Sequence, residues 1–337
     1  MTQSPNRQLP INPAIEASHV ARDFPGTSAL RDVSVTIEHG ELFGLVGPDG
    51  AGKTTFLRIL AGLISMSGGT VRIDGIDVGV DPAAVKEHIG YMSQRFSLSE
   101  TLTVAENLFY VSEVWHVPHG ERRKRVTRLL EFSRLGPFQE RLTRNLSGGM
   151  KQKLSLCACL VHQPRILLLD EPTIGVDPIS RRDLWLILYD LMQEGSTILL
   201  STPYMDEAER CGRVGFLLDG RLIACGPPAV LKRDLGTMIL DLRCADSRGA
   251  RRALQRLRGF EEAVTFGEHL HVTVPRQDFE PEATLAAVRA AGVSVHDWRL
   301  REPSLEDVFL HYTHGGSEAL PAMKNEANGK QGTGNGE

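Results

Sequence analysis

The sequence predicts an α/β protein with a mostly parallel β-sheet, followed by a small α+β domain. Short β-branched runs alternate with helical patterns from about Ile15 to Gly236, which is typical of an α/β layer. A glycine-rich loop, Gly47–Thr54, joins the apolar run Leu42–Val46 to a helical run, as phosphate-binding loops do. After Gly236 the pattern changes, which indicates a second domain.

The composition permits two domains. The 337 residues are 41% hydrophobic and 24% charged, which is enough to bury a sizeable core. No apolar run approaches the roughly 18 residues that span a bilayer, so we expect no transmembrane helix. Residues 1–13 are polar and include three prolines, so we expect a flexible N-terminus that is not a secretory signal.

Charge and cysteine usage exclude two further classes of protein. The formal net charge of −4 disfavours broad nucleic-acid binding, and we expect no nucleic-acid partner. The basic run Arg122–Arg125 with Arg128 is then a solvated helix face. The five cysteines are scattered without a disulfide or metal-ligand pattern, so we expect them to be reduced core residues.

The first domain is expected over residues 14–236 and contains a helical insertion at about residues 96–145. Within the insertion, Thr103–Val111 and Arg123–Phe132 both show apolar residues at helical spacing. These runs interrupt the alternation of strands and helices on either side of them.

The second domain is expected over residues 237–313, with the order βαββαβ. Its elements are strand Met238–Cys244, helix Gly249–Leu257, strands Ala263–Phe266 and His269–Val274, helix Pro281–Ala291 and strand Val293–Leu300. A closing helix, Ser304–Tyr312, begins with Ser304 as its cap. Residues 314–337 are rich in Gly, Asn, Glu and Lys and nearly lack apolar residues, which predicts a disordered tail.

The glycine-rich loop has the residue types that hold a nucleoside triphosphate. Glycines let backbone N–H groups turn toward the phosphates, and the helix N-terminus adds a favourable dipole. Lys53 would neutralise the β/γ oxygens, and the Thr54 hydroxyl would ligate magnesium. The expected contact residues are Gly47, Pro48, Asp49, Gly50, Ala51, Gly52, Lys53, Thr54 and Thr55.

A buried strand, Ile166–Asp170, ends in two carboxylates, Asp170 and Glu171, and Pro172 stops the strand there. Asp170 would hold magnesium directly or through water. Glu171 would polarise the attacking water as a general base. A simple turn at a strand end explains one acid but not two.

A third motif, Leu146-Ser-Gly-Gly-Met-Lys-Gln-Lys153, lies between the loop and the acidic strand end. In this order the three motifs resemble those of the ATP-binding subunit of an ABC transporter, over about two-thirds of the chain. The resemblance implies an ABC-type P-loop domain with ATP and Mg²⁺ as ligands. It also implies that Ser147, Gly148 and Gly149 contact the γ-phosphate of an ATP held by another subunit. An ordinary serine cap of a helix is the alternative.

The resemblance assigns roles to three residues outside these motifs. Phe24 stands where the family places an aromatic residue against adenine, although a lone Phe is more often a core residue. Gln94, in Tyr91-Met-Ser-Gln94, stands where the family glutamine senses magnesium and the attacking water. Asp177 would lie at the dimer seam and link the two sites. Glu171, Gln94 and Lys53 are thus the expected catalytic residues.

One position departs from the family. After the strand Thr197–Ser201, residue 203 is Pro where the family has its switch histidine. Proline cannot donate a hydrogen bond to the γ-phosphate. Losing one such bond in the transition state would slow hydrolysis several-fold to about a thousandfold, whereas ATP binding would persist. The alternative is that a neighbour such as Tyr204 replaces the histidine.

Further segments resemble drug-export ATPases of the ABC-2 type, namely Leu130–Phe138, Val176–Arg182 and Glu302–Leu310. The first two, with Gly47–Gly50, resemble the amino-terminal half of a tandem multidrug exporter ATPase. This resemblance implies a peripheral protein at the cytoplasmic face of the inner membrane. It implies two kinds of partner, integral-membrane permease subunits and a second nucleotide-binding domain, in a homodimer or a heterodimer.

Apolar residues just beyond Gln94 have two interpretations: Phe96, Leu98 and Leu102 would either receive a helix from the permease or form a core of their own. Two functional alternatives also stay open. Pro203 favours a regulatory nucleotide-binding subunit with little turnover. A non-transport ABC protein is disfavoured, because the sequence has neither a second ATPase domain nor long coiled coils. The sequence does not identify the transported substrate, and the role of the second domain stays open.

Overall fold

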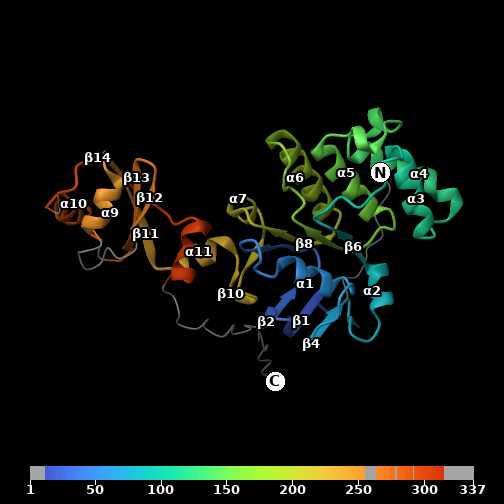
Figure 1. Cartoon of the computed structure of the whole chain (residues 1–337), viewed down its shortest axis with the longest axis horizontal. Coiled ribbons are helices and arrows are strands. Elements are labelled where there is room, and N and C mark those ends of the chain that lie inside the picture. Colours follow the sequence, from blue (N-terminus) through green and yellow to red (C-terminus); the bar gives the residue numbers. More distant parts are fainter. Residues whose placement is uncertain (1–11, 255–262, 278, 291, 315–337) are drawn as a thin grey trace, which may run out of the picture.

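The computed structural model describes residues 12–254, 263–277, 279–290 and 292–314. The expected disorder of the terminal segments concerns residues that lie almost wholly outside this description. A six-stranded sheet forms the centre of the N-terminal domain (Figure 1), in the order β10-β9-β3-β8-β7-β6. The strands are Arg221–Gly226 (β10), Arg213–Leu218 (β9), Leu42–Val46 (β3), Thr197–Thr202 (β8), Ile166–Asp170 (β7) and Ile89–Met92 (β6).

The pairs from β9 to β6 are parallel, and β10 is antiparallel to β9. Every residue of β3, β7 and β8 is buried, as expected for strands covered on both faces. The carboxyl ends of these parallel strands therefore meet at one edge of the sheet.

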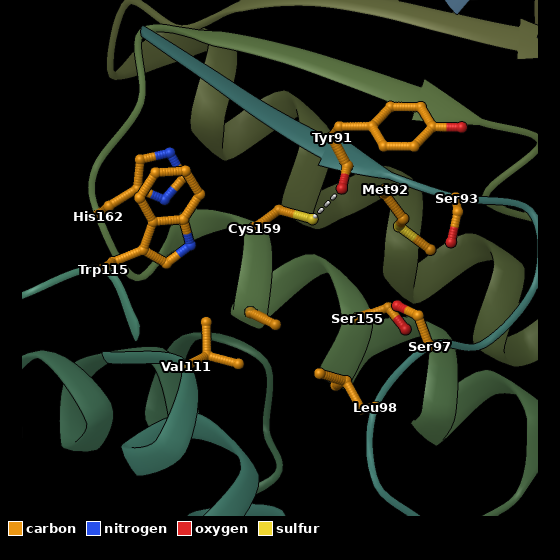
Figure 2. A pocket seen from close by; sticks show the side chains of 11 residues that line it. Tyr91, Met92, Ser93, Ser97, Leu98, Val111, Trp115, Ser155, Cys159 and His162 are labelled. Carbon is orange, nitrogen blue, oxygen red and sulfur yellow. Dashed lines mark hydrogen bonds between the residues drawn. The ribbon is translucent and has the colours of Figure 1, made fainter. Parts of the chain in front are cut away.

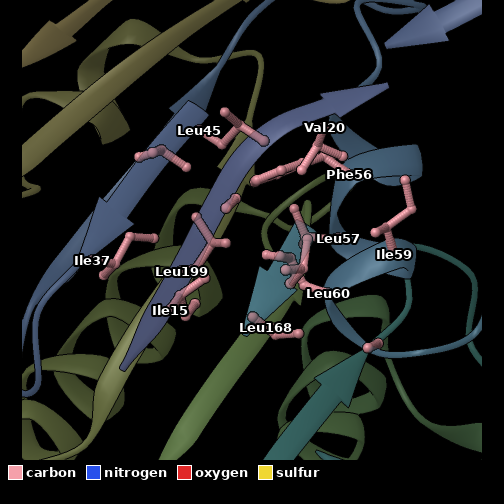
Figure 3. Packing of buried hydrophobic residues seen from close by; sticks show 14 of the residues in the cluster. Ile15, Val20, Ile37, Leu45, Phe56, Leu57, Ile59, Leu60, Leu168 and Leu199 are labelled. Atoms are coloured by element: carbon pink, nitrogen blue, oxygen red, sulfur yellow. The ribbon is translucent and has the colours of Figure 1, made fainter. Parts of the chain in front are cut away.

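A second, antiparallel sheet covers one side of this centre. Its order is β2-β1-β4-β5, and its strands are Ile15–Phe24 (β1), Thr27–Ile37 (β2), Gly68–Ile73 (β4) and Ile76–Asp77 (β5). Helix α1, Lys53–Leu60, packs between the two sheets (Figure 3). Its fully buried Phe56 and Leu57 share one core with Val20 of β1 and Leu168 of β7. This packing fixes the start of α1 beside the ends of β3 and β7. Helix α2, Pro82–His88, lies just before β6.

The expected helical insertion is present. It contains α3, Val104–Val114, and α4, His119–Phe132, followed by 3₁₀ turns at Gly136–Phe138 and Thr143–Asn145 and by α5, Gly148–Leu160. Thr103 and Glu106 form a reciprocal capping box at the start of α3. The expected basic face on α4 is paired within the chain, since Arg122, Arg125 and Arg128 lie within 3.4, 2.5 and 3.1 Å of glutamate oxygens.

A second core lies on the other face of the central sheet. It is built by α6, Pro178–Gln193, the short helix α7, Met205–Ala208, and α8, Pro228–Asp234. The five cysteines are free, as expected. Three are buried core residues, and Cys159 and Cys225 are partly buried. Burial raises the pKa of the Cys157 thiol to about 12. Within the described residues, no helix is both long and apolar enough to cross a membrane.

The C-terminal domain has the expected βαββαβ order. Its elements are Thr237–Cys244 (β11), Ser247–Leu254 (α9), Ala263–Phe266 (β12), His269–Pro275 (β13), Pro281–Ala290 (α10) and Val295–Arg301 (β14). The sheet order is β12-β13-β11-β14, with antiparallel pairs throughout. Residues of α9 and α10 share a buried core with one face of this sheet.

The closing helix α11, Leu305–His314, was expected to form part of the C-terminal domain, but its buried face packs elsewhere. Leu305 and Val308 are completely buried in the core that α6, α7 and α8 build. The ring of Phe309 meets that of Phe216 edge-on at 5.5 Å. Figure 1 shows α11 between the two parts of the molecule. The sequence pattern predicted a helix with an apolar face, but not which surface would cover that face.

Candidate functional site

The phosphate-type loop between β3 and α1 has a backbone that only glycine can adopt at two positions. A Cβ at Gly47 would overlap the carbonyl oxygen of Leu217. At Gly52, φ is +108°, and a Cβ would lie 2.6 Å from the carbonyl oxygen of Ala29. The loop is therefore held closely between β9 and β2, with its backbone turned toward the start of α1.

The N-terminus of α1 is open to an anion. Gly52 supplies no side-chain cap, and no acidic residue lies in the first turn. The N–H groups of this turn and the positive end of the helix dipole thus face a cavity of about 560 Å³. The cavity is lined by Thr27, Ser28, Ala29, Arg31, Asp49, Gly50, Ala51, Gly52, Lys53, Thr54, Thr55, Gln94, Glu171, Asp219 and Gly220.

Lys53 is almost fully buried at the floor of this cavity. Its ammonium donates to the carbonyl oxygens of Gly47 and Pro48, at 2.7 and 3.0 Å, and lies 3.1 Å from Oε1 of Glu171. Every partner of Lys53 is thus an oxygen at the loop or at the strand end. A phosphate oxygen is the same kind of acceptor and carries more charge.

The two acids at the end of β7 are both buried, and each has its own hydrogen bonds. Asp170 Oδ1 accepts from Thr54 Oγ1 at 3.0 Å and from Ser201 Oγ at 2.9 Å. The more distant hydroxyl of Tyr91 donates to the other oxygen, Oδ2, at 3.4 Å. Asp170 is therefore held in place from α1, β8 and β6 together.

Glu171 has a backbone φ of +51°, which is uncommon for a residue with a side chain. Such a conformation persists where the surroundings hold it, and it is frequent at active sites. Its N–H donates to Ser201 Oγ at 3.0 Å, and its Oε2 accepts from Gln94 Nε2 at 2.6 Å. Glu171 thus bridges Lys53 and Gln94 across the cavity.

Two residues of this arrangement were not predicted from the sequence. Ser201 bonds both acids because it lies beside Asp170 in the register of β7 and β8. Tyr91 reaches Asp170 from β6, and burial is the main reason that its pKa is raised. The only signal available for either was its place in a strand that ends at the same sheet edge.

The donor set near Asp170 fits a magnesium ion bound together with phosphates. A carboxylate and a hydroxyl, from Asp170 and Thr54, lie 3.0 Å apart, and Thr54 lines the cavity. Mg²⁺ prefers oxygen ligands and is commonly held by one or two protein groups plus substrate phosphates. The described residues contain no group of three or more His, Cys, Asp or Glu side chains placed to hold a metal.

Ser147, Gly148 and Gly149 lie at the N-terminus of α5, outside the cavity lining. Ser147 Oγ accepts the N–H of Met150 at 3.3 Å, so the serine cap named as the alternative is present, and this bond does not test the role toward another subunit's phosphate. A Cβ at Gly149 would collide with Ser180 in the first turn of α6. The motif therefore packs directly against the turn that contains Asp177.

Asp177 caps α6 and is exposed. Its Oδ1 accepts the N–H groups of Ile179 and Ser180, at 3.1 and 3.0 Å. The bond from Ser180 is the largest cause of its lowered pKa. Beside it, Ile179 is 77% exposed, which is unusual for a large apolar side chain and suits a surface that another chain covers.

Phe24 and Pro203 also lie outside the set of residues that line the cavity. Phe24 ends β1, is partly exposed and stacks with the guanidinium of Arg22 at 4.6 Å. Pro203 connects β8 to α7 and is half-buried. The ring of Tyr204, the neighbour considered as a replacement for the switch histidine, lies under Arg181 of α6 at 4.7 Å.

A second cavity, of about 180 Å³, lies between β6, α3 and α5 (Figure 2), and Ser93, the residue before Gln94, lines it. Leu98, Val111 and Trp115 line it, and the Trp115 ring stacks on His162 at 3.9 Å. Phe96 and Leu98 are partly buried against the core of the helical insertion. Of the two interpretations of these apolar residues, the structure thus supports a core for Phe96 and Leu98, and it also shows a cavity beside them.

Comparison with known proteins agrees with this geometry. A family model described as "ABC transporter" matches residues 30–174, and one for the C-terminal domain of DrrA1-3-like ATP-binding proteins matches residues 226–313. The probable multidrug ABC transporter ATP-binding protein YbhF of Escherichia coli is 40% identical over 89% of the chain, but the chain spans only 52% of that protein. The daunorubicin/doxorubicin resistance ATP-binding protein DrrA of Streptomyces peucetius is 36% identical, over 89% of the chain and 92% of DrrA.

Solved structures show the same fold. The ATP-binding subunit of an ABC transporter has a TM-score of 0.61 at 28% identity, over 66% of this chain and 93% of that one. A dimeric cassette, MJ0796, bound to ADP and Pi, has a TM-score of 0.59 at 27% identity, over 63% and 98%. The sequence relatives, the two family models and the cavity at the start of α1 lead to one conclusion: the chain belongs to the family of ABC transporter ATP-binding proteins with a DrrA-like C-terminal domain.

Proposed function

We propose that this chain binds ATP with Mg²⁺, hydrolyses it, and thereby powers an ABC-2 type exporter of drugs or other small molecules. The observation that carries the proposal is the convergence of Lys53, Asp170 and Glu171 at the open N-terminus of α1. A cationic loop with two buried acids is suited to phosphoryl transfer, where catalysis is mainly positioning and charge stabilisation.

The residues divide this work between them. The N–H groups of the Gly47–Thr55 segment and the Lys53 ammonium bind and orient the phosphates, for which Lys53 exchanges its carbonyl partners. Asp170 and Thr54 would hold Mg²⁺, which supplies charge neutralisation at the β/γ oxygens. Glu171 accepts a proton from the attacking water, and Gln94 orients that carboxylate through its 2.6 Å bond. Phe24 packs against adenine once Arg22 moves aside.

Hydrolysis would take place in a dimer of two such domains. The surface formed by Ser147–Gly149 and the turn at Asp177 lies away from the chain's own cavity and presents the exposed Ile179. We propose that it covers the ATP bound to a second nucleotide-binding domain, identical or homologous. The cavity between β6, α3 and α5 would receive a helix of an integral-membrane permease, since it is open and offers both apolar side chains such as Leu98 and Val111 and polar ones such as Ser93, the residue before Gln94. The chain would then act at the cytoplasmic face of the membrane, without nucleic acid.

Glu171→Gln tests the ATPase proposal. The substitution removes the base but keeps the bond to Gln94 possible, so ATP should bind and stay trapped between two domains. Radiolabelled ATP should then be retained through gel filtration, whereas Lys53→Ala should bind little and Glu194→Gln, at an exposed site, should behave as the parent protein. Loss of ATP from Glu171→Gln as fast as from the parent would contradict the proposal.

Pro203 favours a second candidate, a regulatory subunit that binds ATP and hydrolyses little of it. The carbonyl of the preceding residue, Thr202, accepts the N–H of Gly47, so position 203 lies next to the start of the phosphate loop. Pro203→His should raise ATP turnover several-fold to about a thousandfold with little change in affinity. Turnover that is high in the parent protein and unchanged by the substitution would rule this candidate out.

A further inference from the structure

Strand β14 forms one end of the C-terminal sheet. It pairs with β11 on one side, and the described part of the chain places no strand on its other side. Figure 1 shows this sheet set apart from the N-terminal domain, beyond α11. An end strand presents unpaired N–H and C=O groups and is a template for pairing with another chain.

The hydrogen bonds of β11 show which backbone groups of β14 face outward. The N–H of Cys244 donates to the carbonyl oxygen of Glu268 on the β13 side, so the odd-numbered residues of β11 and their partners in β14 direct their groups toward each other. The N–H of Trp298, on the outer side, donates to Oδ1 of Asp297 at 2.9 Å. In an antiparallel pair, alternate residues direct their N–H and C=O to the same side. His296, Trp298 and Leu300 therefore direct these groups to the open side of the sheet.

The apolar face of the sheet continues past this edge without cover. Trp298 and Leu300 lie directly opposite Leu242 and Leu240, so they share the face that α9 and α10 cover. Leu240 and Leu242 are wholly buried, but Trp298 and Leu300 are 37% and 39% exposed. A strand added beside β14 would bury both side chains.

The charges on the opposite face identify the occupant. Asp297 and Arg299 project there from the strand, with side chains 59% and 81% exposed. The contact between them is a loose one, 3.9 Å between Oδ2 of Asp297 and Nε of Arg299, which a second copy would exchange for pairs between the chains. If a second β14 is added antiparallel with Trp298 opposite Trp298, each Asp297 faces the Arg299 of the other copy. Centring the pair on position 297 or 299 would instead place two like charges opposite each other. The register with opposite charges is also the one in which the outward groups of His296, Trp298 and Leu300 meet.

We infer that β14 is a symmetric pairing surface for a second copy of this chain, centred on Trp298. The four strands of each copy then form one continuous sheet across a two-fold axis. Two Asp297–Arg299 pairs and the two tryptophans define its register. The pairing involves no residue of the ATP site and does not rest on the proposed function.

Charge exchange tests the register in the full chain without nucleotide, so that pairing of the N-terminal domains does not contribute. The parent protein should dimerise in sedimentation equilibrium. Asp297→Arg places two pairs of arginines face to face, and Arg299→Asp places two pairs of aspartates face to face. The dimer dissociation constant of each variant alone should therefore be about tenfold higher than that of the parent protein, or higher still. An equimolar mixture should recover the dimer, because both cross-strand pairs are then of opposite charge. A monomeric parent protein, or a mixture no better than its components, would overturn the inference.

Cysteine cross-linking tests the centre of symmetry without changing charge. Residues opposite each other lie about 5.5 Å apart between Cα atoms, so Trp298→Cys should form a disulfide between copies. Leu300→Cys is the matched control, since it shares face and exposure but lies about 13 Å from its own copy, offset by four residues. Equal cross-linking of both variants, or none, would refute the pairing. If Trp298→Cys were cross-linked to a permease instead, β14 would pair with the permease, and the pairing of two copies would also be refuted.

Discussion

Replacing Leu305 by Ala should destabilise the N-terminal domain, although this residue lies far along the chain in the closing helix. Leu305 is completely buried with Val308 in the core beside α7 and α8. Its N–H also donates to Oε1 of Glu209, at the end of α7, at 3.3 Å. Leu305→Ala removes the buried side chain and leaves the backbone bond in place.

The magnitude follows from the burial. A buried Leu→Ala substitution costs about 2–5 kcal/mol, with the upper end where the neighbours do not collapse into the cavity. One kcal/mol lowers the midpoint of a domain of this size by about 2–4 °C, so Leu305→Ala should lower it by roughly 4–20 °C. Glu306→Ala, on the exposed side of the same turn, should change stability by less than about 0.5 kcal/mol.

Calorimetry with and without ATP assigns the effect to a domain. A ligand raises the midpoint of the domain that binds it, so the transition shifted by ATP reports the N-terminal domain. Leu305→Ala should lower that transition, and Glu306→Ala should not. A decrease confined to a transition that ATP leaves unchanged would show that α11 belongs to the C-terminal domain alone, and would refute the packing argument.

Three further predictions concern single groups. Tyr91→Phe removes the hydroxyl that donates to Asp170, so ATP turnover should fall a few-fold at unchanged ATP affinity, because a 3.4 Å bond is weak. Burial alone would raise the pKa of Asp307, but bonds from Ser304 and the charge of Arg301 outweigh burial and lower it. The stability advantage over Asp307→Asn should therefore be complete above pH 3.8, the ordinary pKa, and disappear in denaturant titrations as the pH falls through the lowered value. Burial is the main cause of the lowered pKa of His162, so unfolding titrations should show stability lost as the pH falls below 6.5, and His162→Phe should reduce this loss.

The parts of the site that could be predicted are those that local sequence determines. Gly52 is required by the loop's own path, since its φ is +108°, and Asp170 and Glu171 stand at the end of a strand that Pro172 stops. Short segments under such local constraints have similar sequences in different proteins. Their chemistry could therefore be assigned before their neighbours were known.

The parts that could not be predicted depend on pairing between distant segments. Ser201 reaches both acids only because β8 pairs with β7 in one register, and a shift by one residue would turn its hydroxyl to the other face. The packing of α11 against α7 could not be predicted either, because amphipathic spacing shows that a helix has an apolar face but not which surface covers that face. Propensity and periodicity predict whether a segment is a helix or a strand, but they do not predict which other segment it contacts.

The closing helix α11 and Pro203 both lie next to one short helix, α7. Thr202, just before Pro203, donates its hydroxyl to the buried Glu207 of α7 at 2.7 Å. Two residues further on, just past the end of α7, Glu209 accepts from Lys232 of α8 at 2.7 Å and from the N–H of Leu305. The loop at Pro203 is therefore held from within the sheet on one side and from α11 on the other. A movement of the C-terminal domain that shifted α11 would act on α7 directly, and through only four helical residues on the position next to the phosphate loop.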